Sequence, residues 1–295
     1  MTGATGFIGT YLVPELIGAG HQVVGLTRSD EGAETLLRAG AAPLHGDLAD
    51  LDGLRAAAQD ADGVIHTAFD HDFSDVKRHS EADRKVVQTL GEALLESDRP
   101  FIVASGTGLV DRAKTRGPAA ETDEPASSAA VPRAATEEAA AALSARGGQV
   151  MVMRLSQVHD TRRQGRIALH IQLARKQGWV AYVGAGENQL SAVHVTDTVH
   201  LFRLALEKGR HGARYHAVDE QGVAMRDIAE AIGARLNLPV RSIAPEAAAD
   251  YFGPIAGLAT LDLAASSDLT REALGWRPRG PSLLSDLQNL DEGAS

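Results

Sequence analysis

The residues near the start of the chain whose types and spacing best fit a chemical role are three glycines at three-residue intervals, Gly3, Gly6 and Gly9. Glycine permits unusual backbone dihedral angles, and its missing Cβ atom lets backbone N–H groups approach a pyrophosphate. Apolar residues at helical spacing follow over residues 11–17, so the turn opens a helix whose N-terminus favours negative charge. A strand-like run, HQVVGLT, comes next. This order predicts a dinucleotide-binding loop made of Gly3, Thr5, Gly6, Phe7, Ile8 and Gly9.

The end of the HQVVGLT run bears on which dinucleotide is bound. An acidic residue there would accept hydrogen bonds from the ribose 2′-OH of NAD and repel the 2′-phosphate of NADP. The sequence has Arg28 and Ser29 instead. Arginine pairs with a phosphate through two N–H groups, and serine can donate its hydroxyl. We therefore expect NADP rather than NAD; the alternative is that Arg28 is an ordinary exposed arginine.

Strand-like and helical segments alternate over the first half of the chain. Helices are expected over 31–39, 51–59, 76–96 and 137–145, and strands over 21–27, 42–48, 63–69, 100–105 and 149–155. This alternation predicts an α/β fold with a doubly wound parallel sheet. Past Leu155 the rhythm breaks down, with helices expected over 167–176 and 223–238 and a strand over 213–218.

The sequence shows no strand before the glycine turn. In a dinucleotide-binding fold the strand before this turn is the central one of the sheet. We therefore expect the first strand to be truncated in this chain, at a cost in buried apolar area.

Composition bounds the class of protein. The chain has 295 residues, of which 44% are hydrophobic and 23% charged, as in globular proteins, and its net charge is −10. The negative charge argues against a nucleic-acid or anionic-membrane partner. No stretch reaches the roughly 18 apolar residues of a membrane span. We also expect no export leader, since no basic and hydrophobic segment is found before Thr2. The chain contains no Cys, which excludes disulfides and thiolate catalysis and favours the cytoplasm.

Several motifs give the chain a family resemblance. It resembles the extended short-chain dehydrogenase/reductase superfamily, of the NAD(P)-dependent epimerase/dehydratase type. The matching segments are TGATGFIG (2–9), GDLAD (46–50), GVIHTA (63–68), MRLSQVH (153–159), AVHVTD (192–197) and LGWRP (274–278). The resemblance implies that Asp47 and Leu48 lie on the adenine side of the cofactor and that Thr67 and Ala68 line it.

The resemblance also implies a division of the chain. We expect a Rossmann-like dinucleotide-binding domain over residues 1–155 and about 191–218. A smaller C-terminal substrate lobe is expected over about 156–190 and 219–295.

The chain departs from the superfamily where the active site is expected. The superfamily uses Tyr-x-x-x-Lys, in which tyrosine is the general acid/base and lysine lowers its pKa. By alignment, Arg133 stands in the tyrosine place and Glu137 in the lysine place. No tyrosine lies between Tyr11 and Tyr182, so the absence does not depend on the alignment. The chain thus resembles the atypical subgroups that lack the standard active site.

Other residues could supply the missing chemistry. Ser105 and Thr107 follow the strand at which the superfamily places its catalytic Ser or Thr, although a serine that only satisfies a turn is the alternative. His71 lies in a cluster with Asp70 and Asp72 and could transfer protons near neutral pH, unless this is simply a solvated loop. We expect no metal site. Further candidates are Tyr182, His159 and His194, whereas His66 is expected to be structural.

The function expected from these observations is that of an NADP-dependent oxidoreductase acting on a small organic carbonyl or alcohol. The alternatives are a non-catalytic NADP-binding sensor or regulatory protein, and an epimerase or lyase that retains its cofactor. The expected partner is a small-molecule substrate, and the chain is expected to be a monomer or homodimer.

Overall fold

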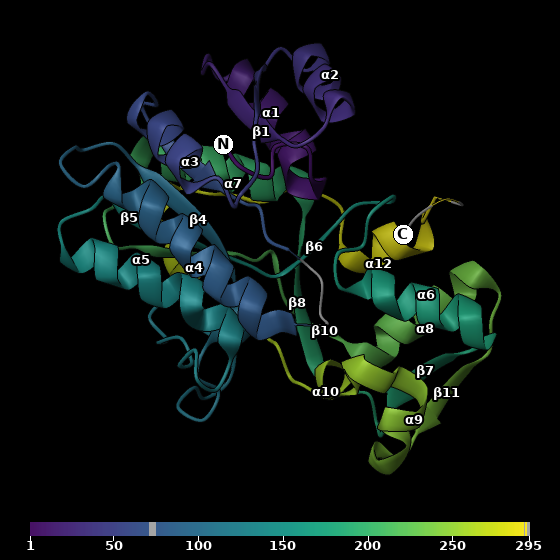
Figure 1. The fold of residues 1–295 in the computed structure, drawn as a ribbon. Coiled ribbons are helices and arrows are strands. Elements are labelled where there is room, and N and C mark those ends of the chain that lie inside the picture. The colour runs from purple at the N-terminus through teal and green to yellow at the C-terminus, as the bar shows by residue number, and fades with distance from the viewer. Residues whose placement is uncertain (71–74, 292, 294–295) are drawn as a thin grey trace.

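A parallel sheet forms the centre of the larger part of the molecule (Figure 1). The computed structural model describes residues 1–70, 75–291 and 293. The strands of this sheet are β1 (Val24–Thr27), β2 (Ala42–His45), β3 (Val64–His66), β4 (Phe101–Gly106), β5 (Val150–Leu155) and β9 (Arg214–Ala217). They form a two-stranded part, β1–β2, and a four-stranded part in the order β3–β4–β5–β9, and all neighbouring strands are parallel.

Met1 and Thr2 lie between β1 and β3, where the first strand was expected. The Met1 amino group donates to the Val24 carbonyl oxygen at 2.8 Å, and the Met1 carbonyl accepts from the Leu26 N–H at 2.9 Å. On the other side, the Thr2 N–H donates to the Ile65 carbonyl at 3.0 Å. Met1 and Thr2 therefore connect β1 and β3 by hydrogen bonds at the centre of the sheet.

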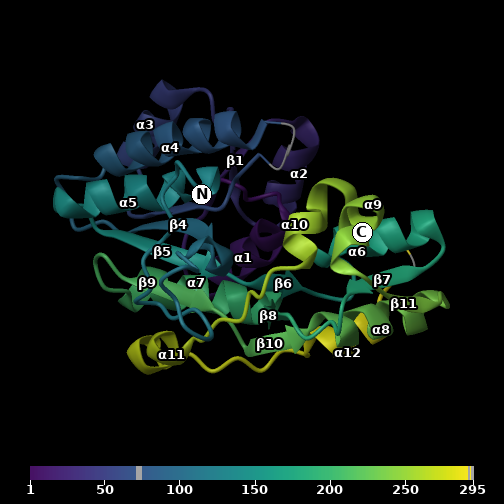
Figure 2. The same cartoon turned by 90° about the horizontal axis from the view of Figure 1, so that it is seen from below.

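Helices cover both faces of the sheet (Figures 1 and 2). One face carries α1 (Phe7–Gly18) and α7 (Val195–Lys208), and the other carries α3 (Leu51–Gln59), α4 (Val76–Glu92) and α5 (Ala135–Ala145). α2 (Asp30–Arg38) packs along β2. The prediction of a doubly wound α/β fold is confirmed.

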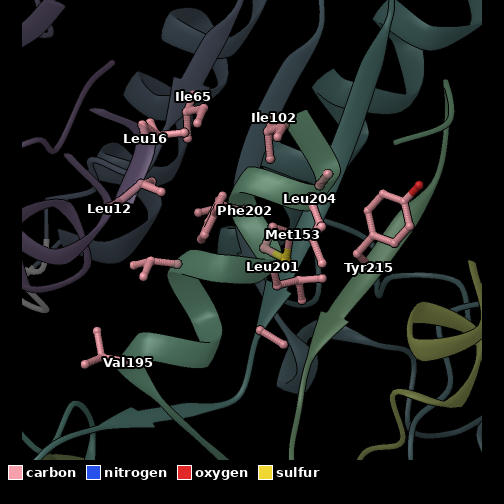
Figure 3. Packing of buried hydrophobic residues seen from close by; sticks show 14 of the residues in the cluster. Leu12, Leu16, Ile65, Ile102, Met153, Val195, Leu201, Phe202, Leu204 and Tyr215 are labelled. Carbon is pink, nitrogen blue, oxygen red and sulfur yellow. The ribbon is translucent and has the colours of Figure 1, made fainter. Parts of the chain in front are cut away.

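Alternation along the strands fills both layers of the core. Phe101 and Val103 of β4 pack toward α3, α4 and α5, whereas Ile102 packs toward α1 and α7. Figure 3 shows part of the second layer, in which Leu12 of α1 and Phe202 of α7 meet the sheet. Apolar side chains on both faces explain why these strands read as nearly continuous hydrophobic runs.

A second, smaller group of elements forms the lobe that Figure 1 shows on the right. Its strands are β6 (Gln157–His159), β7 (Val180–Val183), β8 (Gln189–His194), β10 (Glu220–Ala224) and β11 (Val240–Ile243). Its helices are α6 (Ile167–Gln177), α8 (Met225–Leu236), α9 (Ala248–Phe252), α10 (Ala256–Ala259) and α12 (Leu283–Gln288). The strands form two small sheets, β10–β8–β6 and β11–β7.

Past Leu155, the sequence analysis predicted α6, α8 and β9 but missed α7, which packs on the central sheet, and the short strands of the lobe. Strands of three to six residues carry too few positions for a periodic pattern. α11 (Asp268–Leu274) and the fully buried Trp276 pack with α7, in the core of the larger part. The predicted domain boundaries remain a prediction. Within the described ranges, no helix is long and apolar enough to cross a membrane.

Candidate functional site

The glycine turn has the geometry that a dinucleotide phosphate requires. Gly3 has φ of +68°, and a Cβ atom there would lie 2.5 Å from the Thr67 hydroxyl oxygen. A Cβ on Gly9 would overlap the Gly3 carbonyl oxygen, so α1 can pack closely on the turn only with glycine there. Gly6 forms the N-cap of α1, and no acidic residue lies in the first turn. The first N–H groups of α1 are therefore suited to an anion, and the loop fits a pyrophosphate.

The end of β3 is fastened to this turn. The Thr67 hydroxyl donates to the Thr2 carbonyl at 3.0 Å, and the Ala68 N–H donates to the Thr2 hydroxyl at 3.4 Å. Thr67 and Ala68 are half-buried. The structure thus places this predicted cofactor-lining pair beside the glycines.

The residues expected at the adenine end follow β1 and β2, which are neighbours in the sheet. The Arg28 guanidinium is exposed and lies 4.0 Å from the Asp47 carboxylate. The Ser29 hydroxyl accepts from the Gly32 N–H at 3.1 Å and caps α2, which leaves its own proton free to donate. Leu48 is half-buried against the α3 and α4 side of the core. These side chains gather at the same sheet edge as the glycine turn.

At the carboxyl end of β4, the Ser105 hydroxyl donates to the Glu137 carboxylate at 2.5 Å. The same carboxylate accepts from Arg154 Nε at 2.9 Å and from Arg154 Nη2 at 2.7 Å. Glu137 is 2% exposed and Arg154 is fully buried. A bidentate buried ion pair therefore occupies the place expected of the superfamily's lysine.

Behind this pair the network continues to β9. Arg154 Nη1 lies 3.4 Å from His216 Nε2, and His216 Nδ1 lies 2.8 Å from the Ser266 carbonyl oxygen. Burial, followed by the charge of Arg154, lowers the pKa of His216 to about 4. A neutral His216 then donates from Nδ1 to Ser266 and accepts at Nε2 from Arg154, so the polar groups of this network are satisfied.

Arg133, which by alignment stands where the superfamily has its catalytic tyrosine, is paired with Asp83. Arg133 Nη1 lies 3.1 Å from the Asp83 carboxylate, and Nη2 donates to the Ala104 carbonyl at 3.2 Å. The guanidinium also stacks 4.0 Å from the centre of the Phe69 ring. Arg133 is therefore held on the β3–β4 side of the site.

Asp83 connects Arg133 to the glycine turn. His66 Nε2 lies 2.9 Å from the Asp83 carboxylate, and His66 Nδ1 lies 2.7 Å from the Thr2 hydroxyl. Burial raises the pKa of Asp83, but the hydrogen bond and charge of His66 and the charge of Arg133 outweigh it and hold that pKa below its ordinary value. His66 is buried with two partners, in agreement with its expected structural role.

Of the other catalytic candidates, Thr107 and Tyr182 do not contact Ser105 or Glu137 in any hydrogen bond that the structure describes. Thr107 is buried, with its hydroxyl 3.4 Å from the Leu155 carbonyl and 3.5 Å from the Ser191 hydroxyl. His71 lies outside the described residues. Tyr182 is on β7 in the lobe.

His159 and His194 gather around a carboxylate of the lobe rather than around Ser105. His159 Nδ1 lies 2.7 Å from Asp286 of α12, and His194 Nε2 lies 3.7 Å from the same carboxylate. Burial and the neighbouring His159 lower the pKa of His194 against the charge of Asp286.

The sequence analysis missed three charged residues of this region, Asp83, Arg154 and Arg166. Arg154 carried a signal, because it interrupts the apolar run VMVMRL of a buried strand. Asp83 lies on a helix with many charged residues, and Arg166 lies in a segment with several arginines, so neither stood out.

Comparison with known proteins agrees with this geometry. The profile described as the NAD dependent epimerase/dehydratase family matches residues 1–218. An uncharacterised protein of Schizosaccharomyces pombe is 40% identical over 289 residues, which cover 97% of each chain. The sterol-4-alpha-carboxylate 3-dehydrogenase, decarboxylating, of Dictyostelium discoideum is 28% identical over 240 residues, 77% of this chain and 72% of that protein.

Among solved structures, the dTDP-glucose 4,6-dehydratase DesIV of Streptomyces venezuelae, determined with NAD bound, has the same fold. It is 20% identical, with a TM-score of 0.75 over 97% of this chain and 93% of that chain. Family and structural neighbours bind NAD(P), in keeping with the glycine turn. The chain therefore belongs to the NAD-dependent epimerase/dehydratase family.

Proposed function

We propose that this protein is an NADP-dependent oxidoreductase that acts on a small organic carbonyl or alcohol. The observation that carries the proposal is the Ser105 hydroxyl, held 2.5 Å from the Glu137 carboxylate at the carboxyl end of β4. Parallel strands bind ligands at their carboxyl ends, and the glycine turn lies at the same edge. A proton-transferring hydroxyl and a dinucleotide loop would thus serve one reaction.

Residues of three segments would hold the cofactor. The glycine turn would bind the pyrophosphate, Thr67 and Ala68 would line the nicotinamide half, and Arg28 with Ser29 would bind the 2′-phosphate. When bound, NADP supplies or accepts the hydride. The preference for NADP rests on Arg28, whose guanidinium is exposed and lies 4.0 Å from the Asp47 carboxylate, so that it could turn to a phosphate.

Ser105 and Glu137 would move the proton. The Ser105 proton already points to Glu137, so the Ser105 oxygen can accept a proton from a substrate alcohol as it passes its own proton to the carboxylate. Carbonyl reduction returns a proton through the same atoms in the opposite order. Arg154 positions Glu137 through two N–H groups.

Two other functions have specific support. A non-catalytic NADP-binding protein is favoured by the pairing of Arg133 with Asp83 and of Glu137 with Arg154, which engages both of the usual catalytic places. An epimerase or lyase that retains its cofactor is favoured by the family and by the dehydratase with NAD bound. The dehydrogenase of Dictyostelium discoideum supports the oxidoreductase.

The test is steady-state oxidation of NADPH with a panel of ketones, aldehydes and imines. The expected result is turnover by the parent protein that falls in Ser105→Ala but not in Ser97→Ala, which removes a hydroxyl before the amino end of β4. NADPH binding without turnover across the panel would support the non-catalytic function. A cofactor absorbance that persists through purification, without net NADPH consumption, would support the epimerase or lyase.

A further inference from the structure

Arg166 lies at the mouth of a narrow cavity in the smaller lobe, directly before α6. Its side chain is open to solvent, and in the described part of the chain no carboxylate or carbonyl pairs with its guanidinium. Most of the cavity wall is apolar, and it includes Ile167, Leu190, Met225 and Leu263. The Arg166 guanidinium, which has no side-chain partner among the described residues, therefore faces a mostly apolar cavity.

This guanidinium lies beside the candidate catalytic strand. Gly108 follows Thr107 in the turn after β4, and a Cβ atom on Gly108 would lie 4.0 Å from Arg166 Nη2 and 3.3 Å from a methyl group of Leu263. The turn that begins two residues after Ser105 therefore contacts the cavity mouth. Arg166 therefore lies beside the turn that follows the strand carrying Ser105.

The backbone that carries Arg166 is held in place. The Gln157 side-chain oxygen accepts from the Arg166 N–H at 3.0 Å, and the Gln157 amide donates to the Gln164 carbonyl oxygen. Gly165 has φ of +46°, and a Cβ atom there would lie 2.8 Å from the Val158 carbonyl oxygen. Gln157 and Gln164 are buried. The segment between β6 and α6 is thus organised before any ligand arrives.

Among the described residues, no carboxylate offsets the positive charge of Arg166. Burial lowers the pKa of Arg166, because protein atoms surround the guanidinium even though one side reaches solvent. Burial and then the charge of Arg166 lower the pKa of His170 to about 4, so His170 is neutral at neutral pH. A cation in such surroundings is stabilised by an anion that pairs with it.

We infer that Arg166 binds a carboxylate group of the substrate while its carbonyl or alcohol reacts beside Ser105. The inference rests on the proposed oxidoreductase function and names the class of its substrate. A carboxylate matches two parallel N–H groups of one guanidinium. The cavity has a volume of about 10 Å³, the room of one water molecule, so a carboxylate would lie at its mouth against Arg166 and not inside it. A nucleoside diphosphate needs more space and more than one positive charge.

Binding is tested without turnover by titrating glutarate into the protein saturated with NADP and measuring heat. Arg166→Met keeps the length of the side chain but removes the charge, and it should weaken glutarate binding by about tenfold to a hundredfold. Arg166→Lys should recover part of the loss. Lys176→Met, on the exposed side of α6, is the matched control and should bind as the parent does. No glutarate binding by the parent, or equal binding by Arg166→Met, overturns the inference.

Turnover supplies the second readout. The parent should reduce 4-oxopentanoate with a kcat/KM at least about tenfold above that for its methyl ester, and Arg166→Met should abolish this ratio through KM. Equal rates for acid and ester would overturn the inference while leaving the oxidoreductase intact. Glutarate binding that depends on Arg166, without reduction of any carbonyl, would instead reject the oxidoreductase and keep the carboxylate site.

Discussion

Arg133 and Glu137 show how a catalytic place can be filled without its usual chemistry. A guanidinium stays protonated and a carboxylate carries the wrong charge, so neither can replace tyrosine or lysine. Each is held by a residue of opposite charge, Asp83 and Arg154. Losing one partner would leave a buried charge unpaired, which is strongly destabilising. The proposed chemistry therefore begins at Ser105, whose hydroxyl contacts Glu137.

The first prediction concerns cofactor choice at Arg28. NADPH should bind more tightly than NADH, and Arg28→Asp should erase or reverse this preference, because a charge-assisted contact to the 2′-phosphate is worth about 1.5–3 kcal/mol, or tenfold to a hundredfold in affinity. Fluorescence titration of both cofactors measures this. Arg38→Asp, which makes the same change of charge at the far end of α2, should keep the preference. Equal affinities of the parent for the two cofactors would refute the assignment.

The second prediction concerns the hydroxyls of Ser105 and Thr107. Ser105→Ala and Thr107→Ala should each lower kcat by about tenfold to a thousandfold, because a hydrogen bond to the reacting oxygen is lost. Ser105 should have the larger effect, since only its hydroxyl contacts Glu137. Steady-state kinetics with saturating NADPH would measure both. Full rates in both variants, with a loss in Tyr182→Phe, would move the acid to the lobe.

At the scale of the element, two glycines of the turn before α1 have different roles: one leaves space for a ligand and the other is needed for packing. Among the described residues, a Cβ atom on Gly6 would meet only the Gly3 carbonyl oxygen, at 3.3 Å, and the backbone of Gly6 is extended. The Cβ site on Gly9 lies against backbone atoms of the same turn, including the Ala4 carbonyl carbon at 2.6 Å. Gly6 therefore leaves room for a ligand, whereas Gly9 leaves room for α1 to pack on the turn.

The third prediction follows for Gly6. Gly6→Val should remove dinucleotide binding while the protein still folds, because a branched side chain fills the space of the pyrophosphate. Calorimetric titration of NADPH, with circular dichroism to confirm folding, tests this. Gly18→Ala, at the end of the same helix with open space around it, should bind normally. A folded Gly6→Val that binds NADPH as the parent does would place the site elsewhere.

The fourth prediction follows for Gly9. Gly9→Ala should reduce the free energy of unfolding by about 1–3 kcal/mol, since the turn and α1 must move apart to admit the methyl group. Urea denaturation of the two proteins gives the difference. Unchanged stability would show that the turn can relax at no cost.

At the scale of the molecule, the neutral buried histidines couple stability to pH. The pKa values of His170 in the lobe and His216 in the central sheet are both lowered to about 4. An unfolded histidine titrates near 6.5, so the unfolded state binds more protons between these values and stability falls as pH falls. Each histidine contributes on the order of 3 kcal/mol, present above pH 6.5 and lost progressively toward pH 4.

The fifth prediction uses this coupling. The free energy of unfolding should fall between pH 7.5 and pH 5, and His170→Gln should reduce that fall because it cannot titrate. Asp83 titrates below its ordinary range. Burial lowers the pKa of the Met1 amino group to about 6, so this group affects the parent and His170→Gln alike and the difference between them reports His170. The exposed His211→Gln is the control and should keep the parent's dependence on pH. Urea denaturation at the two pH values would contradict the prediction if parent and His170→Gln lost the same stability.

Much of the dinucleotide half could be predicted because its signals are local. Gly3, Gly6 and Gly9 lie within one turn and one helix, and the alternation of strands and helices needs only nearby residues. The same holds for Arg28 and Thr67, since the ends of neighbouring parallel strands meet at one edge. The lobe gave weaker signals because its strands are short and pair across long stretches of chain.

What the sequence determined by itself is a parallel α/β fold with a loop suited to a dinucleotide phosphate and the lack of tyrosine and lysine at the usual catalytic place. What only the tertiary structure decided is which groups meet there. Ser105 contacts Glu137 across 32 residues, and Glu137 meets Arg154 because β4 and β5 pair in one particular register. Arg166 approaches Gly108 only because the lobe packs against the end of β4. Such contacts depend on the relative placement of distant segments, which local spacing does not encode.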